Sequence, residues 1–450
     1  MRFNVLRAVQ AIIAVFALFG GTRADGLKRT QSSLCGEQLD RQTDFLDGIY
    51  YAFFMSSSPD PPRSIPVVLW LSGGPGCSGL VGALFELGPC SFDDEANQMQ
   101  LNKHSWINIA HVIFVDQPRG TGFSDMRTGV AGWTERGAMR DLAAFVKAFF
   151  KKNPSLQMND FYIFGESFGG HYAPDLGALL IKNDPQRWSR TLKGIGIGNG
   201  VVSSISGLQT YLDFIEDNKY ATNLLDVSRE TFKGLQSTAL ELMLQCRASR
   251  TTSAAAHGRM RARALDDDCE DDVPQVCHDA VVAATNLEQT ALRGVVGSGH
   301  NMYDLRRPCH VADPLGLCYH FSRLQGYVNQ PQVLEYFGVP NDTWSLCSMD
   351  VMATIREIDF WGESANKVAY LLEKGVRVLV YAGDADAMAP WNMQERWTSD
   401  MVWGGSLAYR SKSTVPLRMK GKDAGTVRSA RGLSLVRVYE SGHVSTDQVC

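Results

Sequence analysis

Six short apolar runs, each ending in a glycine-rich turn, constrain the fold more than any other feature of this 450-residue sequence. A continuous run of branched and aromatic side chains is typical of a strand that is buried on both faces, as in a sheet covered by helices. The six runs are Ile65–Gly74, Ala110–Gly120, Asn159–Ser167, Leu192–Gly200, Val376–Asp386 and Leu433–His443.

Helical patterns lie between these runs, for example over residues 135–152 and 168–183. Alternation of strand and helix predicts an α/β fold with a mostly parallel central sheet flanked by helices. Ligand sites in such sheets lie at the carboxyl ends of the strands. The glycine turns follow those ends, so we expect the functional residues there.

The middle of the chain has a different pattern. Residues 201–346 contain no clear strand signal and are mainly helical in pattern, which predicts an inserted cap between two parts of the core, 25–200 and 347–450. Within the insertion, the segment near 246–272 has few bulky apolar residues and carries basic and then acidic blocks. We expect an exposed loop there, with arginines open to proteolysis.

The N-terminus predicts entry into the secretory pathway. Arg2 and Arg7 precede an apolar run, and Thr22 and Ala24 are the small residues that signal peptidase requires, so residues 1–24 are expected to be a signal peptide. A membrane anchor is the alternative, but a spanning helix needs about 20 apolar residues and this run is shorter. No later segment is suited to cross a bilayer.

The ten cysteines fit an oxidising compartment, where most are expected to form disulfides. Histidines near Cys309 and Cys318 offer a weak zinc alternative, but spaced cysteine pairs are lacking and no metal is expected. Asn341 begins a glycosylation acceptor sequence. The net charge of −4 gives no support to a nucleic-acid partner.

The stretch GESFG places Ser167 between Gly165 and Gly169, after a strand and before a helix. This is the nucleophile-elbow pattern of α/β hydrolases. A serine hydroxyl needs a base to become a nucleophile, and in this fold an acid and then a histidine follow it along the chain. His443, directly after the last strand, is the expected base.

Asp384 and Asp386 both follow the preceding strand. One of them is expected to orient the imidazole and the other to form the turn. An oxyanion hole needs two backbone N–H groups. We expect one from Phe168 and the other from the glycine turn at Gly73 and Gly74, although that turn could also be purely structural.

Together these motifs resemble the serine carboxypeptidase family. The family order is found in WLSGGPGCSG, DQPRGTGFSD, GESFGGHYAP, GIGIGNG, YAGDAD and SGH, and the resemblance extends from about Phe45 to His443. It implies an α/β-hydrolase fold with an inserted cap, peptide substrates with a free C-terminus, no cofactor and a lysosome-like or vacuole-like compartment or secretion. It leaves a homodimer open.

The resemblance also implies roles for individual residues. By position, the nucleophile, acid and base are Ser167, Asp386 and His443, the oxyanion donors are Gly74 and Phe168, and a disulfide joins Cys77 to Cys347. The family's carboxylate-binding acid matches Glu166, and its partner acid matches Glu86. Two close carboxyl groups share a proton, so binding of a C-terminal carboxylate is expected to be favoured at acid pH. The alternative is that Glu86 is a surface helix residue with no role in binding.

Departures from the family pattern keep other functions open. The resemblance places Ser72 and Gly73 at the substrate carboxylate, but position 72 is usually an asparagine that donates to it. Val444 follows His443 in place of the family's methionine. These differences favour an acyltransferase or esterase as the alternative to a carboxypeptidase. A third possibility, a non-catalytic partner of another lumenal protein, is suggested by the family's final helix, which has no counterpart after His443.

Overall fold

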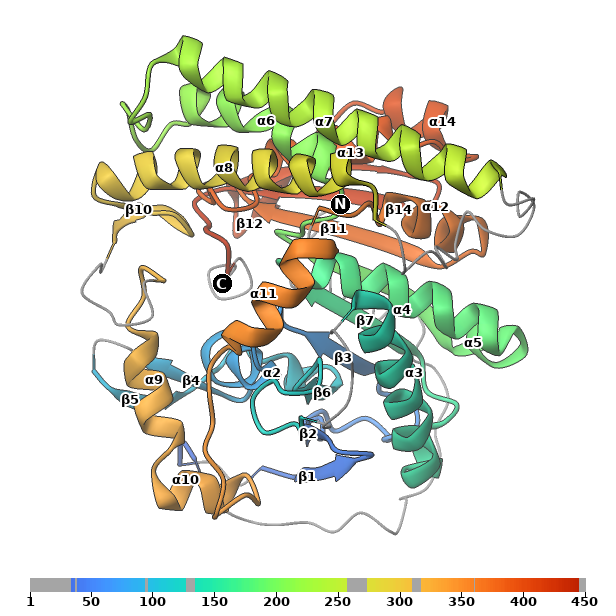
Figure 1. Cartoon of the computed structure of the whole chain (residues 1–450). Helices are drawn as coiled ribbons and strands as arrows, with labels where there is room; N and C mark the ends of the chain where they lie inside the picture. The colour runs from blue at the N-terminus through green and yellow to red at the C-terminus, as the bar shows by residue number, and fades with distance from the viewer. Residues whose placement is uncertain are drawn as a thin grey trace.

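The computed structural model describes residues 34–36, 39–93, 96–126, 134–256, 273–309, 317–359 and 361–444. The expected signal peptide, residues 1–24, lies outside these ranges. Within them the chain forms a ten-stranded mixed sheet with helices on both faces and further helices at one end (Figure 1).

Six adjacent parallel strands form the centre of the sheet. In spatial order they are β6 (His111–Val115), β3 (Val67–Leu71), β7 (Phe161–Glu166), β8 (Leu192–Gly198), β11 (Arg377–Gly383) and β14 (Leu433–Val438). Each of the six apolar runs in the sequence contains one of them, which confirms the predicted α/β class. β3 is buried along its whole length because helices cover both faces of the sheet.

Antiparallel strands extend the sheet at both edges. They are β1 (Arg41–Leu46) and β2 (Ile49–Phe54) beyond β6, and β13 (Lys422–Ala430) and β12 (Val415–Met419) beyond β14. A separate hairpin is formed by β4 (Cys90–Asp93) and β5 (Gln98–Leu101). The sheet is therefore parallel in its middle and antiparallel at its margins.

Alternate residues of β3 enter two different cores. Val67, Leu69 and Leu71 pack into the core that also contains the apolar faces of two long helices, α3 (Glu135–Lys152) and α4 (Gly169–Asn183). Val68 and Trp70 face the other core. This alternation is the two-residue period of a strand covered on both sides.

The remaining helices around the core are shorter. They are α2 (Gly79–Val81), a π-helical turn (Gly82–Glu86), two 3₁₀ turns (Trp106–Asn108 and Pro154–Leu156), α5 (Pro185–Thr191), α12 (Ala365–Glu373), α13 (Trp391–Asp400) and α14 (Ser406–Arg410). α12 packs on α4, and α13 packs beside β11.

The described residues between β8 and β11 are mainly helical, and they extend the core at one end. They include α6 (Ser204–Asp217), α7 (Arg229–Ala256), α8 (Gln275–Gly297), a short hairpin of β9 (His300–Asn301) and β10 (Asp304–Pro308), α9 (Phe321–Val328), α10 (Pro331–Tyr336) and α11 (Met349–Ile358). In Figure 1, α6, α7 and α8 lie together over the end of the sheet that carries β11 and β14. Most of these elements lie within residues 201–346, for which the sequence predicts an inserted cap, and we refer to them as the cap.

The prediction of a loop near 246–272 is wrong for residues 246–256. α7 continues as a helix to Ala256, and its Cys246 forms a disulfide with Cys277 of α8. The segment is rich in alanine and arginine, which have high helix propensity, and α7 packs lengthwise on α8. The rest of the expected loop, residues 257–272, lies outside the described part of the chain.

Four disulfides join described cysteines: Cys35–Cys90, Cys77–Cys347, Cys246–Cys277 and Cys309–Cys318. They account for eight of the ten cysteines; Cys269 and Cys450 lie outside the described residues. The two cysteines of the weak zinc alternative, Cys309 and Cys318, are therefore bonded to each other.

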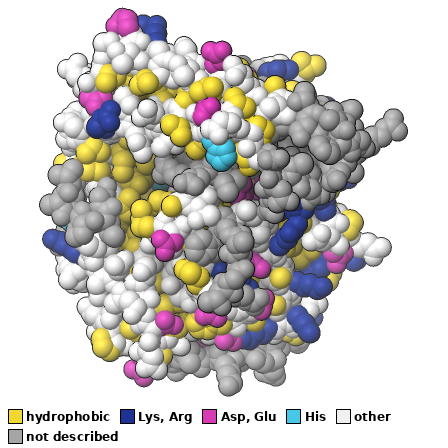
Figure 2. All heavy atoms as spheres, viewed as in Figure 1, with side chains coloured by type: hydrophobic (Ala, Val, Ile, Leu, Met, Phe, Trp, Pro, Cys, Tyr) yellow, Lys and Arg dark blue, Asp and Glu magenta, His cyan; other side chains and the backbone are white. Residues whose placement is uncertain are grey.

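The surface in the view of Figure 2 carries both signs of charge. Apolar side chains gather below α8 on the side of β10 and α9, whereas lysine and arginine side chains gather on the side of α3. Among the helices of the described residues, none is both long and apolar enough to cross a membrane.

Candidate active site

Ser167 lies in the tight turn between β7 and α4 and has a left-handed backbone conformation, with φ of 58°. Such an angle is uncommon outside glycine and is found where a strained turn presents a side chain. The Ser167 N–H donates to the carbonyl of Gly198 at 3.0 Å, and the Gly170 N–H donates to the Ser167 carbonyl at 2.9 Å. The serine side chain is partly exposed, although its neighbours in the turn are buried.

Two glycines leave room for this turn. A Cβ atom on Gly165 would lie 2.0 Å from the carbonyl oxygen of Gly169. A Cβ atom on Gly169 would lie 2.6 Å from the carbonyl oxygen of Leu71 in the neighbouring strand. Both contacts are with backbone, which cannot move aside as a side chain can. The spacing of the GESFG motif therefore follows from the packing of the turn.

The ends of β11 and β14 bring Asp386 and His443 together. Asp386 is fully buried, and its Oδ2 accepts a hydrogen bond from His443 Nδ1 at 2.7 Å. The same carboxylate also accepts from the backbone N–H of Met388 at 2.9 Å and of Ala389 at 3.2 Å. These donors fix the position of the carboxylate, and it in turn orients the imidazole ring.

Asp384 has a different environment. Its carboxylate accepts hydrogen bonds from the Tyr220 hydroxyl, from the Glu440 N–H at 3.0 Å and from Arg437 at 3.3 Å. It also forms an ion pair with Lys219 at 3.4 Å. Of the two acids that the sequence left open, Asp386 contacts the imidazole, and Asp384 joins the ends of β11 and β14 to the cap.

Asn199 is a further polar contact of Asp386, and its role was not predicted from the sequence. Its side-chain amide donates to Asp386 Oδ2 at 2.7 Å, and its own oxygen accepts from the Gly383 N–H at 3.1 Å. Asn199 directly follows β8 and has φ of 41°. The signal was present in GIGIGNG, because a polar residue just after a buried parallel strand lies at the edge where ligand sites form.

The other nitrogen of the imidazole faces Glu166. His443 Nε2 lies 2.9 Å from Glu166 Oε1, and no hydrogen bond joins the Ser167 hydroxyl to His443 among the contacts of the described residues. Burial would lower the pKa of His443, but the charges of Asp386 and Glu166 outweigh it and raise the pKa well above 6.5. The two carboxyl groups on either side of the ring therefore favour the protonated form of His443.

The glycine turn after β3 lies directly against Ser167. A Cβ atom on Gly73 would be 2.5 Å from the Ser167 Cβ and 2.7 Å from the Phe168 nitrogen. Gly74 has φ of 108°, a conformation that favours glycine. The two stretches expected to supply oxyanion donors are thus in contact, and a close backbone approach requires glycine at position 73.

Glu86, at the end of the π-helical turn, is buried rather than a surface helix residue. Burial and then the charges of Glu86 and Glu166 raise the pKa of the Tyr381 hydroxyl well above 10, so both carboxyl groups lie near that ring. Glu166 was expected to share a proton with Glu86; the contact described for its Oε1 is with His443. Ser72 is buried as well, and its hydroxyl has no hydrogen-bond partner among the described residues.

The disulfide Cys77–Cys347 joins the glycine turn after β3 to the segment just before α11. The Ser348 N–H donates to the Gly76 carbonyl at 2.8 Å, and the Ser78 N–H donates to the Leu346 carbonyl at 2.9 Å. The segment before α11 is thereby bonded to the turn that carries Gly74. Asn341, the expected glycosylation position, is exposed a few residues earlier in the chain.

A second cluster of buried titratable groups lies behind the nucleophile turn. The His171 ring stacks on Phe168 with 4.7 Å between ring centroids, and its Nδ1 lies 3.1 Å from Glu135 Oε2. Burial raises the pKa of Glu135 to about 7 and that of Asp175 to about 6, and it lowers the pKa of His171 to about 4. The sequence gave no sign of this cluster, because its members come from separate elements.

We expect the protein to be more stable at pH 5 than at pH 7.5. Folded Glu135 keeps its proton up to about pH 7, whereas in the unfolded chain it loses the proton near pH 4.5. Unfolding thus releases a proton in this window, and stability falls as the pH rises through it. The shifts of Asp175 and His171 have opposite signs and similar windows, so they nearly cancel. The raised pKa of His443 acts in the same direction as that of Glu135 above pH 6.5.

The expected loss in the free energy of unfolding is about 2 kcal/mol between pH 5 and pH 7.5, because each pH unit between pH 5 and the folded pKa of Glu135 contributes about 1.4 kcal/mol. Urea unfolding at the two pH values measures it. The glutamine of Glu135→Gln is neutral at both pH values, so this variant should show a smaller change in the free energy of unfolding with pH. Glu373→Gln, at the end of α12, serves as the control. Equal slopes for Glu135→Gln and the unmodified protein would contradict the assignment.

A sheet with a parallel centre, a tight turn with Ser167 after β7, and a contact between Asp386 and His443 at the strand ends are typical of an α/β hydrolase. Comparison with protein-family models narrows the class: residues 40–449 match the model of the family described as serine carboxypeptidase. The chain belongs to the serine carboxypeptidase family of hydrolases. The resemblance seen in the six sequence motifs is thereby confirmed.

Individual relatives agree. The chain is 30% identical over 405 residues to Serine carboxypeptidase-like 48 of Arabidopsis thaliana, covering 88% of this chain and 71% of that protein. It is 30% identical over 409 residues to the vacuolar serine-type carboxypeptidase ATG42 of Saccharomyces cerevisiae, covering 89% and 74%. Among solved structures, the prohormone-processing carboxypeptidase Kex1Δp from Saccharomyces cerevisiae is similar in fold. It has a TM-score of 0.68 and 22% identity, and the match covers 92% of this chain and 85% of that one.

Proposed function

We propose that the protein removes C-terminal residues from peptides and proteins by a Ser-His-Asp acyl-enzyme mechanism that is favoured at acid pH. The observation that carries this proposal is the position of His443, whose ring is held between Asp386 and Glu166. Glu166 directly precedes Ser167, so a group that can recognise a carboxylate is adjacent to the group that can attack a peptide bond.

In this mechanism the Ser167 oxygen attacks the carbonyl carbon of the last peptide bond while His443 Nε2 takes its proton. The N–H groups of Gly74 and Phe168 stabilise the negative oxygen that forms. Collapse of this intermediate breaks the C–N bond, and His443 returns the proton to the departing amino acid. Water then attacks the acyl-enzyme in the same way and releases the shortened peptide.

His443 can act as a base only after Nε2 gives up its contact with Glu166 and contacts the Ser167 hydroxyl instead. A charged imidazole with a charged Glu166 contains the same number of protons as a neutral imidazole with a neutral Glu166. The C-terminal carboxylate of a substrate placed beside Glu166 favours its neutral form, because two adjacent negative charges repel. Substrate binding would thus move the proton to Glu166 and leave Nε2 ready to accept one from Ser167.

This exchange requires that the Glu166–His443 pair retains one proton. As the pH rises and that proton is lost, Glu166 becomes negative and repels the substrate carboxylate. Glu86 is a second carboxyl group near Tyr381, and its negative charge adds to the repulsion of the substrate carboxylate. Affinity for a free C-terminus is therefore highest at acid pH. An acidic compartment of the secretory pathway would suit such an enzyme, as the vacuolar relative and the four disulfides support.

The test is amino-acid release from an N-blocked dipeptide between pH 4.5 and pH 7.5. KM is expected to rise about tenfold per pH unit once the Glu166–His443 pair has lost its shared proton. The C-terminally amidated peptide should be a weaker substrate at pH 4.5 and should lack this dependence. Glu166→Gln should remove most of the pH dependence of KM and leave only the part due to Glu86, because glutamine can donate to a carboxylate and does not ionise. Ser167→Ala provides the blank.

A pH-independent KM for the free acid in the unmodified protein would contradict the role of Glu166. Failure of Ser167 to react with a fluorophosphonate probe would contradict the nucleophile itself.

An acyltransferase or esterase on the same fold is the second candidate, and the buried hydroxyl of Ser72 favours it. A serine is shorter than the asparagine usual in the family, and it reaches a substrate carboxylate less well. No release of amino acid from the dipeptide, together with fluorophosphonate labelling of Ser167, would support this candidate. Ser72→Asn would then be the first variant to test for recovered peptidase activity.

A further inference from the structure

The hairpin formed by β9 and β10 is bonded to the loop that carries Asp386. The Leu305 N–H donates to the Ala385 carbonyl at 2.9 Å, and the Ala387 N–H donates to the Met302 carbonyl at 3.0 Å. These bonds involve the residues on either side of Asp386. A segment from the cap thus fixes the backbone of the acid loop on both sides of the acid.

The same hairpin is bonded to the loop that carries His443. The His443 N–H donates to the Tyr303 carbonyl at 2.7 Å. A Cβ atom on Gly442 would lie 2.5 Å from that carbonyl oxygen and 2.8 Å from the Asp304 Cβ, so the two backbones are in close contact. The Tyr303 ring centroid also lies 5.3 Å from that of the imidazole. The hairpin therefore joins the acid loop to the base loop.

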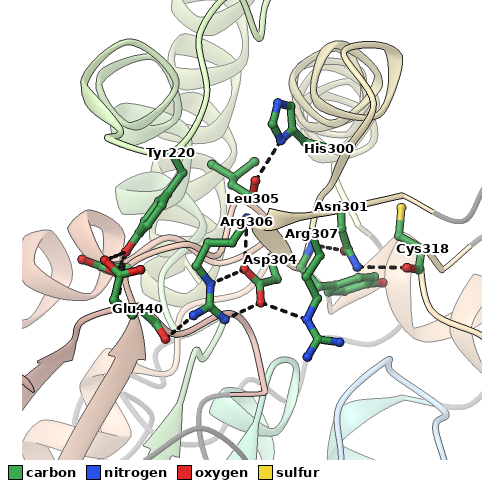
Figure 3. Close-up of polar contacts among 11 residues, drawn as sticks. Tyr220, His300, Asn301, Asp304, Leu305, Arg306, Arg307, Cys318 and Glu440 are labelled. Carbon is green, nitrogen blue, oxygen red and sulfur yellow. Dashed lines mark hydrogen bonds and ion pairs between the residues drawn. The ribbon is translucent and has the colours of Figure 1, made fainter. Parts of the chain in front are cut away.

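An ionic cluster holds the hairpin in this position (Figure 3). Asp304 has no solvent-exposed surface, and its Oδ1 accepts from the Arg306 N–H at 3.1 Å and from Arg306 Nε at 2.7 Å. Arg306 Nη1 donates to the carbonyl of Glu440, at the start of the His443 loop. Arg307 contributes a longer ion pair to Asp304, at 3.6 Å. Figure 3 shows Arg306 pointing between Asp304 and Glu440, and Arg307 pointing away from Glu440.

We propose that Arg306, anchored by Asp304, is a positioning residue that sets the His443 loop against Asp386. The inference rests on the proposed function, because it assigns a purpose to the contact between His443 and Asp386. Arg306 acts through the backbone of Glu440 and does not touch the imidazole. Without it the Glu440 carbonyl loses its bond to the hairpin, and the cap then contacts Glu440 through Lys219 and Tyr220. The start of the loop is held less firmly against the hairpin, and His443 can move relative to the acid. Displacement of a reacting group by about 1 Å can cost about 100-fold in rate.

This role predicts a specific kinetic pattern. Arg306→Ala should lower kcat by about 10-fold to 100-fold and leave KM within about twofold, because Glu166 and Glu86 are untouched. A looser contact with Asp386 removes part of the charge that raises the pKa of His443. The pKa seen in the pH profile of kcat should therefore fall in the variant. Arg306→Lys keeps one charged donor and should recover part of the loss.

The matched control is Arg307→Ala. Arg307 is the next residue of the same strand and pairs with the same aspartate, but no contact of the described residues links it to the His443 loop. It should show unchanged kcat and an unchanged pH profile. If both variants gave the same kinetics, the positioning role would be overturned, and the cluster would serve only to hold the cap.

A second readout does not depend on turnover. The proton between His443 Nδ1 and Asp386 should give a resolved downfield NMR signal in the unmodified protein and in Arg307→Ala. The signal should broaden or disappear in Arg306→Ala, or in Arg306→Lys if the alanine variant does not fold. An unchanged signal in the folded Arg306 variant would overturn the proposal. Because this signal is observed without substrate, its result stands apart from any failure of the carboxypeptidase assignment.

Discussion

Ser167→Ala is expected to lower kcat for peptide hydrolysis about 10⁶-fold and Asp386→Asn about 10⁴-fold, with both proteins still folded. Alanine removes the oxygen that forms the acyl bond, and no other hydroxyl occupies the tight turn between β7 and α4. Alanine and serine have similar tolerance for the positive φ at position 167, so the turn should be retained. The residual rate would come from substrate binding and the oxyanion donors.

The loss at Asp386 has a different cause. Its Oδ2 accepts hydrogen bonds from His443, Asn199 and Ala389, whereas Oδ1 accepts from Met388. The amide oxygen of an asparagine should take the Oδ2 position, because an NH₂ group there would face three donors. The imidazole would keep its orientation and lose the negative charge that stabilises its protonated form.

Asp384→Asn is the matched control, two residues earlier on the same loop. It weakens the bonds to Tyr220 and Arg437, and it leaves every described contact of His443 in place. We expect its kcat to stay within about tenfold of the unmodified protein. Stopped assays with an N-blocked dipeptide measure all three variants. Equal losses for Asp384→Asn and Asp386→Asn would show that the effect is one of loop structure and not of charge beside the imidazole.

Gly165→Ala is expected to destabilise the protein by about 4 kcal/mol or to prevent folding. The new methyl group would lie 2.0 Å from the carbonyl oxygen of Gly169 and 2.5 Å from its carbonyl carbon. Both atoms belong to the first turn of α4, which is packed against the sheet. The clash can be relieved only by opening the turn that carries Ser167, so activity should be lost with stability.

Gly234→Ala tests whether this result is specific to the turn. Gly234 is inside α7, and a Cβ atom there would meet nothing within 4 Å. Replacing a helical glycine with alanine should therefore raise stability by about 0.5 to 1 kcal/mol. Urea unfolding compares the two variants. A Gly165→Ala protein as stable as the unmodified one would mean that the turn can relax in a way its packing does not indicate.

The sequence predicted the centre of the sheet because burial on both faces leaves a clear pattern. β3 reads VVLWL and β11 reads RVLVYAG, and both are apolar almost throughout. The strands β12 and β13 gave no such signal. β12 has one buried residue among five and β13 has one among nine, so their sequences resemble those of loops. Edge strands can be polar because solvent covers one side.

The sequence predicted which residues form the candidate site, but it did not predict how their side chains contact one another. Ser167, Asp386 and His443 could be chosen because each directly follows a strand that the pattern identified. The contact between Glu166 and His443 could not be predicted, because it depends on the rotamers of two side chains from distant parts of the chain. The β9–β10 hairpin was missed for a related reason: it is too short to leave a periodic pattern.

The cap leaves and rejoins the core at neighbouring points. Ser203 and Glu363 pair as an isolated antiparallel bridge, and the Ser364 N–H donates to the Val202 carbonyl at 2.9 Å. An excursion whose two ends meet can change in length or sequence without altering the register of β8 and β11. The cap can therefore be replaced while the sheet and the loops that carry Asp386 and His443 stay the same. Grafting a relative's cap between these two points could change which chains the enzyme accepts, provided that the hairpin bonds to the acid and base loops are retained.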